Sequence, residues 1–514
     1  MEILHQIMLT GVIFFPILCG ILIALLPWKS RKSMEIFTEI VVVLNAVAAL
    51  FIVFGGVNEN VTLITFVENY TISFHVDGLG RVFGGLVSFL WPFATLYAFE
   101  YMEHDANEKS ARFESFFGFY TMTFGITLAI AFAANILTMY CFYEMLTLVT
   151  VPLILFSLQR PAILAVRQYL YYSLGGAAFG FVGIVFLMNY GTTIDFTLGG
   201  VLDPAKIAGH ENLLRVIFIM AFFGFSVKAA IFPLHSWLPK AGVAPTPVTA
   251  LLHAVAVVKA GAFAVLRLIY YSFGTDLLKG TYAQYIPLTF AMFTIVFGCS
   301  MAVKEQHLKR RLAYSTVSNL SYILFGALIM SDAGMVGAMS HMLFHAVMKI
   351  TSFFCVGAVM VRSGKAYVYE MDGMAKRMPK IMAIFTVSAL ALMGVPGLCG
   401  FVSKWNLAKA AVESGDVWCY AGIGCLLLSA LLTAIYMLTT VIKAYFPVKE
   451  NEAALTENGS EQSLAKISTE PSKKCDPGIR MLLPLTVFTL AMFAFGLFSS
   501  PIIRALETIA KGGM

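Results

Sequence analysis

One apolar stretch of the sequence carries a lysine, a histidine and two prolines inside it: Phe225-Ser226-Val227-Lys228-Ala229-Ala230-Ile231-Phe232-Pro233-Leu234-His235-Ser236-Trp237-Leu238-Pro239. A second stretch is interrupted in the same way: Met393-Gly394-Val395-Pro396-Gly397-Leu398-Cys399-Gly400-Phe401-Val402-Ser403-Lys404-Trp405. Proline and glycine inside an apolar helix free backbone groups that neighbours or water must satisfy. We therefore expect two broken helices that line a cavity. The breaks are expected at Pro233 in the first stretch, and at Pro396, Gly397 and Gly400 in the second.

The composition around these stretches places the chain in a lipid bilayer. Of its 514 residues, 59% are hydrophobic and 12% are charged, whereas about a quarter are charged in an average soluble protein. A water-facing surface needs more charge than this, so a soluble enzyme, a disordered chain and a nucleic-acid-binding protein are excluded. We expect an all-α integral membrane protein with no nucleic-acid partner.

Apolar runs long enough to span the bilayer recur along the whole chain. A spanning helix needs about 20 mostly apolar residues, and this rule predicts about 14 transmembrane helices. Their approximate bounds are Ile7–Pro27, Met34–Phe54, Val82–Tyr101, Phe113–Ala133, Asn135–Leu158, Tyr169–Tyr190, Leu214–Leu234, Val248–Tyr271, Tyr285–Val303, Leu312–Met330, Met335–Met360, Ile381–Lys404, Val417–Phe446 and Met481–Ser499. The first run begins with Met1-Glu2 and has no small-residue cleavage site, so we expect a retained helix rather than a signal peptide.

Lysine and arginine in the connecting loops predict the orientation. Alternate loops are basic, with Lys29/Arg31/Lys32, Lys109/Arg112, Arg160/Arg167, Lys304/Lys309/Arg310/Arg311 and Arg362/Lys365/Lys376/Arg377/Lys380. Basic loops remain in the cytoplasm, which also accounts for the net charge of +6 without an acidic partner. We therefore expect a multi-pass protein of the cytoplasmic membrane with both termini on its outer face. Alternating polar and apolar residues in Glu59–Asp77 predict an outer-face hairpin, and Val448–Ile479 reads as a mobile, hydrophilic cytoplasmic loop.

Signatures of redox cofactors and metals are missing from the sequence. Seven of the eight cysteines fall in apolar runs and no CxxC pair occurs, so a disulfide framework, a zinc ribbon and iron–sulfur ligation are unsupported. No glycine-rich phosphate loop and no haem or flavin signature is present. We expect no cofactor, no metal and no catalytic redox residue in this chain, which instead moves something charged.

Eight ionisable residues lie well inside the apolar runs: Glu144, Lys228, His253, Lys259, His341, His345, Lys349 and Lys404. Each would cost about 2.5–3.5 kcal/mol at the bilayer centre, and the set together about 20 kcal/mol. That sum exceeds the net stability of a typical folded protein. These side chains must therefore face one another or water inside the bundle. All of them except His253 form, in chain order, a candidate polar path across the protein, parallel to the membrane plane.

Glu144 and Lys228 are the natural ion pair, because the helix that carries Lys228 breaks just beyond it. One interpretation is a structural pair that holds two helices together. The other is a proton switch: a nearby carboxylate favours the charged form of a buried ammonium, so a change in their separation makes Lys228 bind or release a proton.

The remaining histidines and lysines also have more than one interpretation. His253 is either a satisfied core histidine or part of a relay with Lys259, and a buried ammonium without a role is rare. His341, His345 and Lys349 follow at intervals of four residues, along one stripe of a helix. Two such histidines could bind zinc, but a lysine one turn away repels the ion and no further ligand is placed nearby. A ladder for protons suits these groups better, since histidine titrates near neutrality.

Several of these motifs resemble a known family. The run Lys228–Ala241 with Ala244–Ala254, Glu144, His341-Met342-Leu343-Phe344-His345-Ala346 with Lys349, and Gly400-Phe401-Val402-Ser403-Lys404 resemble the antiporter-like membrane subunits. Respiratory complex I, Mrp-type multisubunit cation/proton antiporters and group 4 membrane-bound nickel–iron hydrogenases share these subunits. The resemblance covers nearly the whole chain.

The resemblance implies a core of fourteen helices with two inverted five-helix repeats, each containing a broken helix. The N-terminal helices with their hairpin would occupy residues 1–112, the repeats 113–271 and 272–446, the hydrophilic loop 447–479 and the last helix 480–514. In the family, a glutamate and a lysine form the modulating pair, which a lysine or histidine links to a lysine or glutamate on the second broken helix. By residue match, these roles fall on Glu144, Lys228, Lys259 with His253, and Lys404.

The resemblance also implies the function: a proton-translocating subunit of a redox-driven ion pump or hydrogenase. Such a subunit would move H⁺, either alone or coupled to Na⁺. The partners would be further membrane subunits, antiporter-like ones among them, and peripheral redox subunits. The alternatives are a D-type subunit of an Mrp-type antiporter without a redox partner, a stand-alone antiporter, and a structural scaffold. One complex I subunit type has a glutamate at the position of Lys404, which disfavours that type. The largest complex I subunit has a long lateral helix after its last spanning helix, and this sequence has no room for one. Whether the chain counts as part of an enzyme depends on its complex, since it has no redox site of its own.

Overall fold

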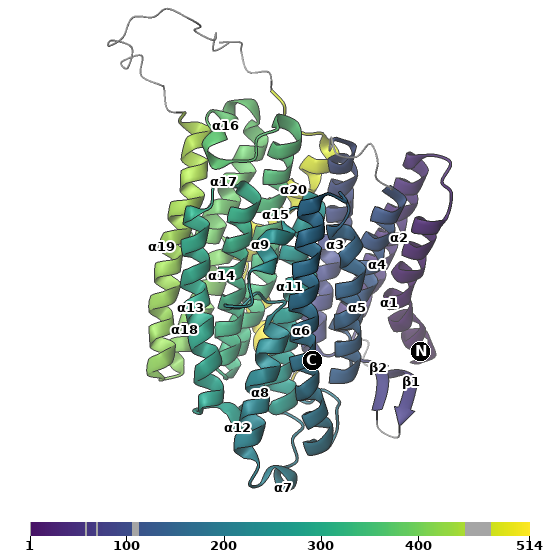
Figure 1. The fold of residues 1–514 in the computed structure, drawn as a ribbon, viewed down its shortest axis with the longest axis vertical. Helices are drawn as coiled ribbons and strands as arrows, with labels where there is room; N and C mark the ends of the chain where they lie inside the picture. The colour runs from purple at the N-terminus through teal and green to yellow at the C-terminus, as the bar shows by residue number, and fades with distance from the viewer. Residues whose placement is uncertain (1, 57–58, 68–69, 105–112, 448–473, 514) are drawn as a thin grey trace, which may run out of the picture.

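The computed structural model describes residues 2–56, 59–67, 70–104, 113–447 and 474–513, and in it helices run side by side in one bundle (Figure 1). The helices are α1 (Glu2–Leu25), α2 (Arg31–Phe54), α3 (Gly78–His104), α4 (Phe113–Ala131), α5 (Ile136–Ile154), α6 (Arg160–Tyr190), α7 (Pro204–Ile207), α8 (Glu211–Ser226), α9 (Trp237–Ala241), α10 (Thr246–Ala250), α11 (Val257–Leu266), α12 (Thr275–Leu278), α13 (Tyr282–Lys304), α14 (Leu308–Leu328), α15 (Asp332–Ser363), α16 (Met374–Arg377), α17 (Pro379–Met393), α18 (Cys399–Glu413), α19 (Val417–Tyr445), α20 (Ile479–Leu497) and α21 (Ser500–Ala510). Two π-helical segments, η2 (Leu251–Val255) and η3 (Arg267–Phe273), flank α11, and a 3₁₀ turn, η4 (Val368–Glu370), precedes α16.

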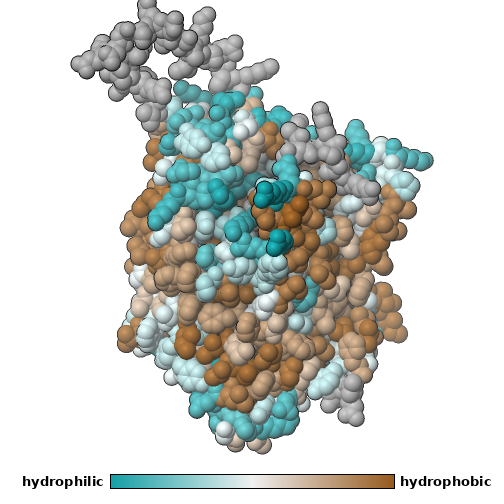
Figure 2. Space-filling model, viewed as in Figure 1, coloured by the Kyte–Doolittle hydropathy of each residue, from teal (hydrophilic) through white to brown (hydrophobic). Residues whose placement is uncertain are grey.

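The surface of the bundle matches a protein that lies in lipid. Apolar side chains dominate its middle, and hydrophilic ones gather toward both ends (Figure 2). Large side chains on the outer helices point outward, among them Leu25 at 76% exposure, Phe54 at 83% and Leu431 at 60%. In water such a surface would be unstable, so the prediction of an all-α, multi-pass membrane protein is confirmed.

The number of spans depends on how the interrupted helices are counted. Eleven of the described helices are long and apolar enough to cross a membrane, against the fourteen predicted, so that count is not confirmed. The other three predicted spans coincide with α8, with α14 and with the pair α17 and α18. The first and last are divided by the breaks, and α14 carries three charged residues, Lys309, Arg310 and Arg311, in its first turn.

Two spans lie at the centre of the bundle. The segment Thr246–Phe273 is completely buried and the most apolar part of α15 is 89% buried, whereas the outer span Ile479–Leu497 is only 28% buried. The central spans carry five of the eight predicted ionisable residues, on α11, η2 and α15. The fold therefore removes these five groups from lipid.

The predicted hairpin is present. Strands β1 (Val61–Val67) and β2 (Tyr70–Phe74) pair antiparallel, with Val61 opposite Phe74. They lie at the end of the bundle opposite α16 (Figure 1). Of the predicted mobile loop Val448–Ile479, residues 448–473 lie outside the described residues, as do the predicted basic residues Lys109 and Arg112.

Both predicted breaks occur, but Gly400 lies in the first turn of α18 rather than in the second break, and the second span differs from its predicted bounds. Helix α8 ends at Ser226 and α9 begins at Trp237. Helix α17 ends at Met393, and α18 runs from Cys399 to Glu413. The sequence predicts that this span ends at Lys404, but Lys404 lies inside α18, because the carbonyls of Leu392 and Met393 accept from its ammonium within the bundle. The proposed inverted repeats and domain bounds remain predictions.

Candidate functional site

The first break is held by side chains from neighbouring helices. Tyr143 on α5 donates its hydroxyl to the carbonyl of Phe225 at 2.9 Å, and Trp237 donates its indole N–H to the carbonyl of Val227 at 2.9 Å. Inside the break, Ala230 has φ +56°, a conformation that costs an L-residue about 1–2 kcal/mol. Neighbouring groups thus satisfy the freed carbonyls, as a broken helix in a membrane requires.

Lys228 lies at the start of this break, opposite Glu144 on α5. Its Nζ is 3.7 Å from Glu144 Oε1, with the lysine side chain 1% exposed and the glutamate 21% exposed. Lys228 Nζ also donates to the carbonyl of Tyr143 and lies 3.3 Å from the centre of the Tyr143 ring. The two groups that the sequence suggested as a pair are therefore in ion-pair distance, with Lys228 buried and Glu144 near the wall of the bundle.

A glycine brings the broken helix against the central helix. A Cβ at Gly261 would lie 2.6 Å from the amide nitrogen of Ala229 and 2.9 Å from Lys228 Cβ. Only glycine permits this approach without displacement of the backbone. Since Gly261 follows Lys259 by two residues on α11, the contact fixes Lys228 beside the helix that carries Lys259.

Lys259 begins a series of direct contacts toward the second break. Its Nζ lies 2.5 Å from His345 Nδ1 on α15. The His345 ring stacks on His341 with centroids 5.6 Å apart and planes inclined by 18°. His341 Nδ1 then lies 3.0 Å from the hydroxyl oxygen of Ser403 on α18. Lys259, His341, His345 and Ser403 are all completely buried, so this series crosses the interior of the bundle.

Lys404 stands at the second break. Its Nζ donates to the carbonyls of Leu392 at 2.7 Å and Met393 at 3.0 Å, which belong to the last turn of α17 and lack helical partners. Gly394 follows with φ +94°, and a Cβ there would lie 3.0 Å from Lys404 Cδ. The aromatic ring of Tyr322 lies between His341 and Lys404, 5.1 Å from the imidazole centroid and 5.5 Å from Nζ.

Lys349 turns away from the histidines with which it shares a stripe. Its Nζ donates to the Ser315 hydroxyl at 2.7 Å and to the Leu312 carbonyl at 3.1 Å on α14. Ser315 Oγ lies 2.5 Å from the Tyr436 hydroxyl on α19, and the backbone carbonyl of Tyr436 accepts from Arg311 at 2.8 Å. Lys349 therefore belongs to a side branch toward α19, because α14 offers it hydroxyl and carbonyl acceptors.

His253 is apart from these contacts. It lies in η2, completely buried, and its ring packs 4.9 Å from that of Phe353 on α15. Neither ring nitrogen has a hydrogen-bond partner among the described residues. The structure thus does not bring His253 to Lys259, with which the sequence had grouped it.

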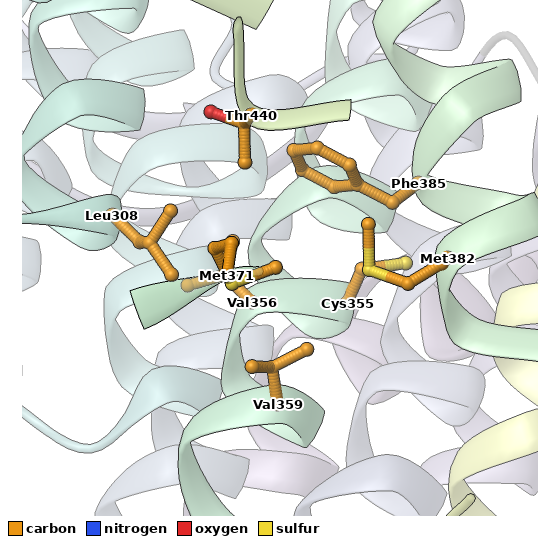
Figure 3. A pocket seen from close by; sticks show the side chains of 8 residues that line it. All are labelled: Leu308, Cys355, Val356, Val359, Met371, Met382, Phe385 and Thr440. Carbon is orange, nitrogen blue, oxygen red and sulfur yellow. The ribbon is translucent and has the colours of Figure 1, made fainter. Parts of the chain in front are cut away.

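The described residues include no group of three His, Cys, Asp or Glu side chains that could hold a metal. One cavity near the side branch has a volume of about 10 Å³ and an almost wholly apolar lining (Figure 3). Its walls are Leu308, Cys355, Val356, Val359, Met371, Met382, Phe385 and Thr440.

Sequence reasoning missed the hydroxyl groups that join the charged residues. Ser403 contacts His341, and Ser315 joins Lys349 to Tyr436. Serine and tyrosine are common in membrane helices, so residue type alone gives no signal. For Ser403 a signal existed, since it directly precedes Lys404 in the interrupted stretch.

Comparison of the sequence and the structure with known proteins identifies a family of similar proteins. A sequence profile described as NADH:quinone oxidoreductase/Mrp antiporter, TM, matches residues 133–433. The NADH-quinone oxidoreductase subunit N of Desulforudis audaxviator is 30% identical over 421 residues, which cover 81% of this chain and 80% of that protein. In structure, the chain resembles one from the Mrp complex of Dietzia sp. DQ12-45-1b, with a TM-score of 0.82 at 20% identity, covering 99% of this chain and 97% of that chain. It also resembles a chain of the membrane-bound sulfane sulfur reductase, an archaeal respiratory membrane complex, with a TM-score of 0.79 at 20% identity and coverage of 98% and 97%. At these identities the two solved structures show a shared fold.

Proposed function

The chain belongs to the NADH:quinone oxidoreductase/Mrp antiporter transmembrane family, and we propose that it is a proton-translocating subunit of a multisubunit ion pump. Protons move along a buried path, called here the proton file, which consists of Glu144, Lys228, Lys259, His345, His341, Ser403 and Lys404. His253 and Lys349 flank this file. The file runs from the wall of the bundle near α5 to the second break at α18.

The contact between Lys259 and His345 is the observation that carries this proposal. Two bases that each bind one proton lie 2.5 Å apart in the most buried spans of the protein. A structural ammonium in a membrane is normally paired with a carboxylate or with carbonyls, whereas Lys259 has an imidazole. An amine beside an imidazole is suited to passing a proton.

The chemistry of the file follows from its partners. When Lys228 moves relative to Glu144, its proton loses the stabilisation that the carboxylate supplies. Lys259 passes a proton to His345 Nδ1 through their hydrogen bond. Transfer from His345 to His341 requires a water molecule, because the rings are stacked and both Nε2 atoms lack a protein partner among the described residues. A second positive charge near Lys404 then favours release of its proton.

The orientation belongs to this proposal as well. The described basic residues of α16, Lys376 and Arg377, lie at the end opposite the hairpin (Figure 1). With basic loops in the cytoplasm, the hairpin and both termini face outward from the cytoplasmic membrane. The proton file then lies roughly parallel to the membrane plane.

Further membrane subunits, including antiporter-like ones, and peripheral redox subunits are the proposed partners. The relative from Desulforudis audaxviator is by name a subunit of an NADH-quinone oxidoreductase, which favours a redox-driven complex. The alternative is the D-type subunit of an Mrp-type antiporter. Purification of the tagged chain from its native membrane distinguishes the two, since redox subunits copurify only in the first case.

Lys228→Ala tests the function itself. Proton uptake by proteoliposomes that contain the whole complex should fall to background, while the assembled complex keeps its wild-type level, because alanine removes the titrating group and its burial cost. The matched control is Lys240→Ala, which removes an exposed lysine from α9 just past the same break and should pump normally. Normal uptake by Lys228→Ala would contradict the proposal.

A further inference from the structure

A second group of buried polar side chains lies on α2, α3 and α4, away from the proton file. Each of its members has a buried polar atom without a hydrogen-bond partner among the described residues. These atoms are Thr38 Oγ1, Glu39 Oε2, Asn45 Nδ2, Ser88 Oγ, Trp91 Nε1 and Tyr120 Oη. We call these six residues the N-terminal polar cluster. None of the eight ionisable residues singled out in the sequence belongs to it.

The three helices that carry this cluster pack together. Helix α3 packs against both α2 and α4. The rings of Trp91 and Tyr120 lie 5.6 Å apart, and the Glu39 carboxyl interacts electrostatically with Tyr120. On α2, Thr38 and Asn45 are two turns apart on the buried stripe. Six buried donors and acceptors thus lie on three helices that pack together, and contacts join Glu39, Tyr120 and Trp91.

A dry interior does not suit these groups. A buried polar group without a partner loses the hydrogen bonds that it makes to water in the unfolded chain. Enclosed polar groups of this kind are normally satisfied by buried water, each molecule of which makes about three hydrogen bonds. The hydroxyl, amide, indole and carboxyl groups of this cluster can donate and accept the hydrogen bonds that a few buried water molecules require.

Glu39 differs from the carboxylate one turn away. Glu35, 4% exposed, has two arginine partners: Arg31 Nε at 2.9 Å and Arg480 Nη1 at 3.1 Å. Glu39, one turn further along α2, is half-buried and has no ion pair among the described residues, while its Oε2 is buried and unpartnered. A charged carboxylate in that position would be unstable, whereas a protonated carboxyl acts as a donor as well as an acceptor.

The charged groups around Glu39 are engaged elsewhere. From α3, Glu100 accepts the amides of Gly478 and Met481, and Glu103 pairs with Arg480 of α20. The titratable groups of α4 are Tyr120, which belongs to the cluster, and Glu114 in the first turn of the helix. Helix α1 contributes only the Cys19 thiol beyond its first turns. No described cation is therefore left to hold Glu39 in its ionised form.

Helix α3 also separates the cluster from the proton file. On its opposite side, Tyr97 stacks on Phe354 of α15 with centroids 3.7 Å apart and donates its hydroxyl to the Phe354 carbonyl at 2.7 Å. Toward the start of α2, in contrast, Glu35 leads to Arg480 and Glu103, which are 37% and 41% exposed. Access to the cluster is therefore from the end of the bundle where α2 begins.

We propose that the N-terminal polar cluster is a water-filled proton-binding site, separate from the proton file, in which Glu39 is the group that binds the proton. Its ligands are a proton and water, and it exchanges them with the face on which Glu35, Glu103 and Arg480 lie. This site goes beyond the proposed function, since transport along the file does not pass through it.

Infrared spectra of the purified complex test the protonation of Glu39. The wild type should show the C=O stretching band of a protonated carboxylic acid, shifted in D₂O because the site exchanges with water. The band should be absent from Glu39→Gln, retained by Glu39→Asp and retained by the matched control Glu35→Gln. Identical spectra for wild type and Glu39→Gln would overturn the proposal. So would loss of the band when sodium chloride replaces choline chloride, since that would identify a cation site.

Labelling with dicyclohexylcarbodiimide, which reacts with protonated carboxyls in apolar surroundings, is the second measurement. The protonated carboxyl adds to the carbodiimide, and acyl transfer to nitrogen leaves a stable N-acylurea that retains all atoms of both. Mass spectrometry should find the adduct on Glu39 but not on Glu35, and Glu39→Gln should still translocate protons. An adduct on Glu35 instead, or loss of translocation by an assembled Glu39→Gln complex, would overturn the proposal.

Discussion

Individual residues of the proton file differ in what stabilises their charge. Lys228 has a carboxylate at 3.7 Å, Lys404 has two carbonyls at the end of α17, and Lys259 has an imidazole. A charge held only by neutral acceptors is costly in the interior, so the positions of Lys259 and Lys404 suit a side chain that can lose its proton. A lysine does this when its surroundings change, whereas a guanidinium keeps its charge.

At Lys404 this difference predicts opposite outcomes for two substitutions. Lys404→Arg keeps the positive charge but should lower the rate of proton uptake by about a hundredfold, the order that a proton-transfer group contributes. Lys404→Glu should keep partial activity, because a carboxylate exchanges protons. The rates would be measured in proteoliposomes at equal complex content. Full activity of Lys404→Arg would identify Lys404 as a fixed cap of α17.

Elements of the fold set how closely these residues approach, and the sequence predicted them unevenly. The proline and glycine positions predicted both breaks, and residue alternation predicted the hairpin, because both signals are local. The direction of Lys349 depends on two acceptors of α14, which lie 34 and 37 residues earlier in the chain. The link through Ser403 arises because α18 restarts beyond the break with its first turn against α15. Such contacts depend on tertiary packing that no local pattern encodes.

Glycine at the second break is predicted to be essential for packing. A Cβ at Gly400 would lie 1.8 Å from the carbonyl oxygen of Ala391 and 2.9 Å from Met348 Sδ. Gly400→Ala should therefore separate α18 from α17 and destabilise the protein by about 1–3 kcal/mol or more, lowering the thermal unfolding midpoint and proton uptake together. The control Gly424→Ala on α19, where a Cβ meets nothing within 4 Å, should leave both unchanged. A normal midpoint for Gly400→Ala would show that the break is looser than this contact implies.

The whole molecule is tied together by a pair that the sequence did not indicate. Asp77, just before α3, binds the guanidinium of Arg267 at 2.5 and 2.6 Å. Arg267 is 1% exposed, Asp77 is 21% exposed, and the rings of Phe196, Phe263 and Tyr271 lie within 5.0 Å of the guanidinium carbon. This pair joins the segment after the hairpin to the end of the central span. It therefore couples the N-terminal helices to the part of the molecule that holds Lys259.

Removal of one partner of this pair should destabilise the whole bundle. Asp77→Asn leaves a buried guanidinium without a counter-charge, which costs about 3–5 kcal/mol, and should lower the thermal unfolding midpoint. The double variant Asp77→Asn/Arg267→Met should recover much of the loss, since it removes the uncompensated charge. If the double variant is no more stable than Asp77→Asn, the loss does not come from the unpaired arginine.

The pair also predicts a dependence of stability on pH. Burial raises the pKa of Asp77, but the charge and hydrogen bonds of Arg267, with the Gly80 amide, outweigh burial and leave this pKa below its ordinary value. A lowered carboxyl pKa adds stability above the unfolded value of about 3.9, and this stability is lost as the pH falls through the folded value. The difference in unfolding midpoint between wild type and Asp77→Asn should therefore be constant near neutral pH and shrink in acid below about pH 4.

Proton uptake by Lys259→Arg is the measurement that tests the proton file most directly. Arginine keeps the positive charge and a hydrogen-bond donor beside His345, so the complex should assemble with its wild-type subunits. Because a guanidinium does not release its proton, uptake should fall to background while Lys240→Arg, the exposed control, pumps normally. Wild-type uptake by the assembled Lys259→Arg complex would show that protons do not pass through Lys259, and would contradict the account.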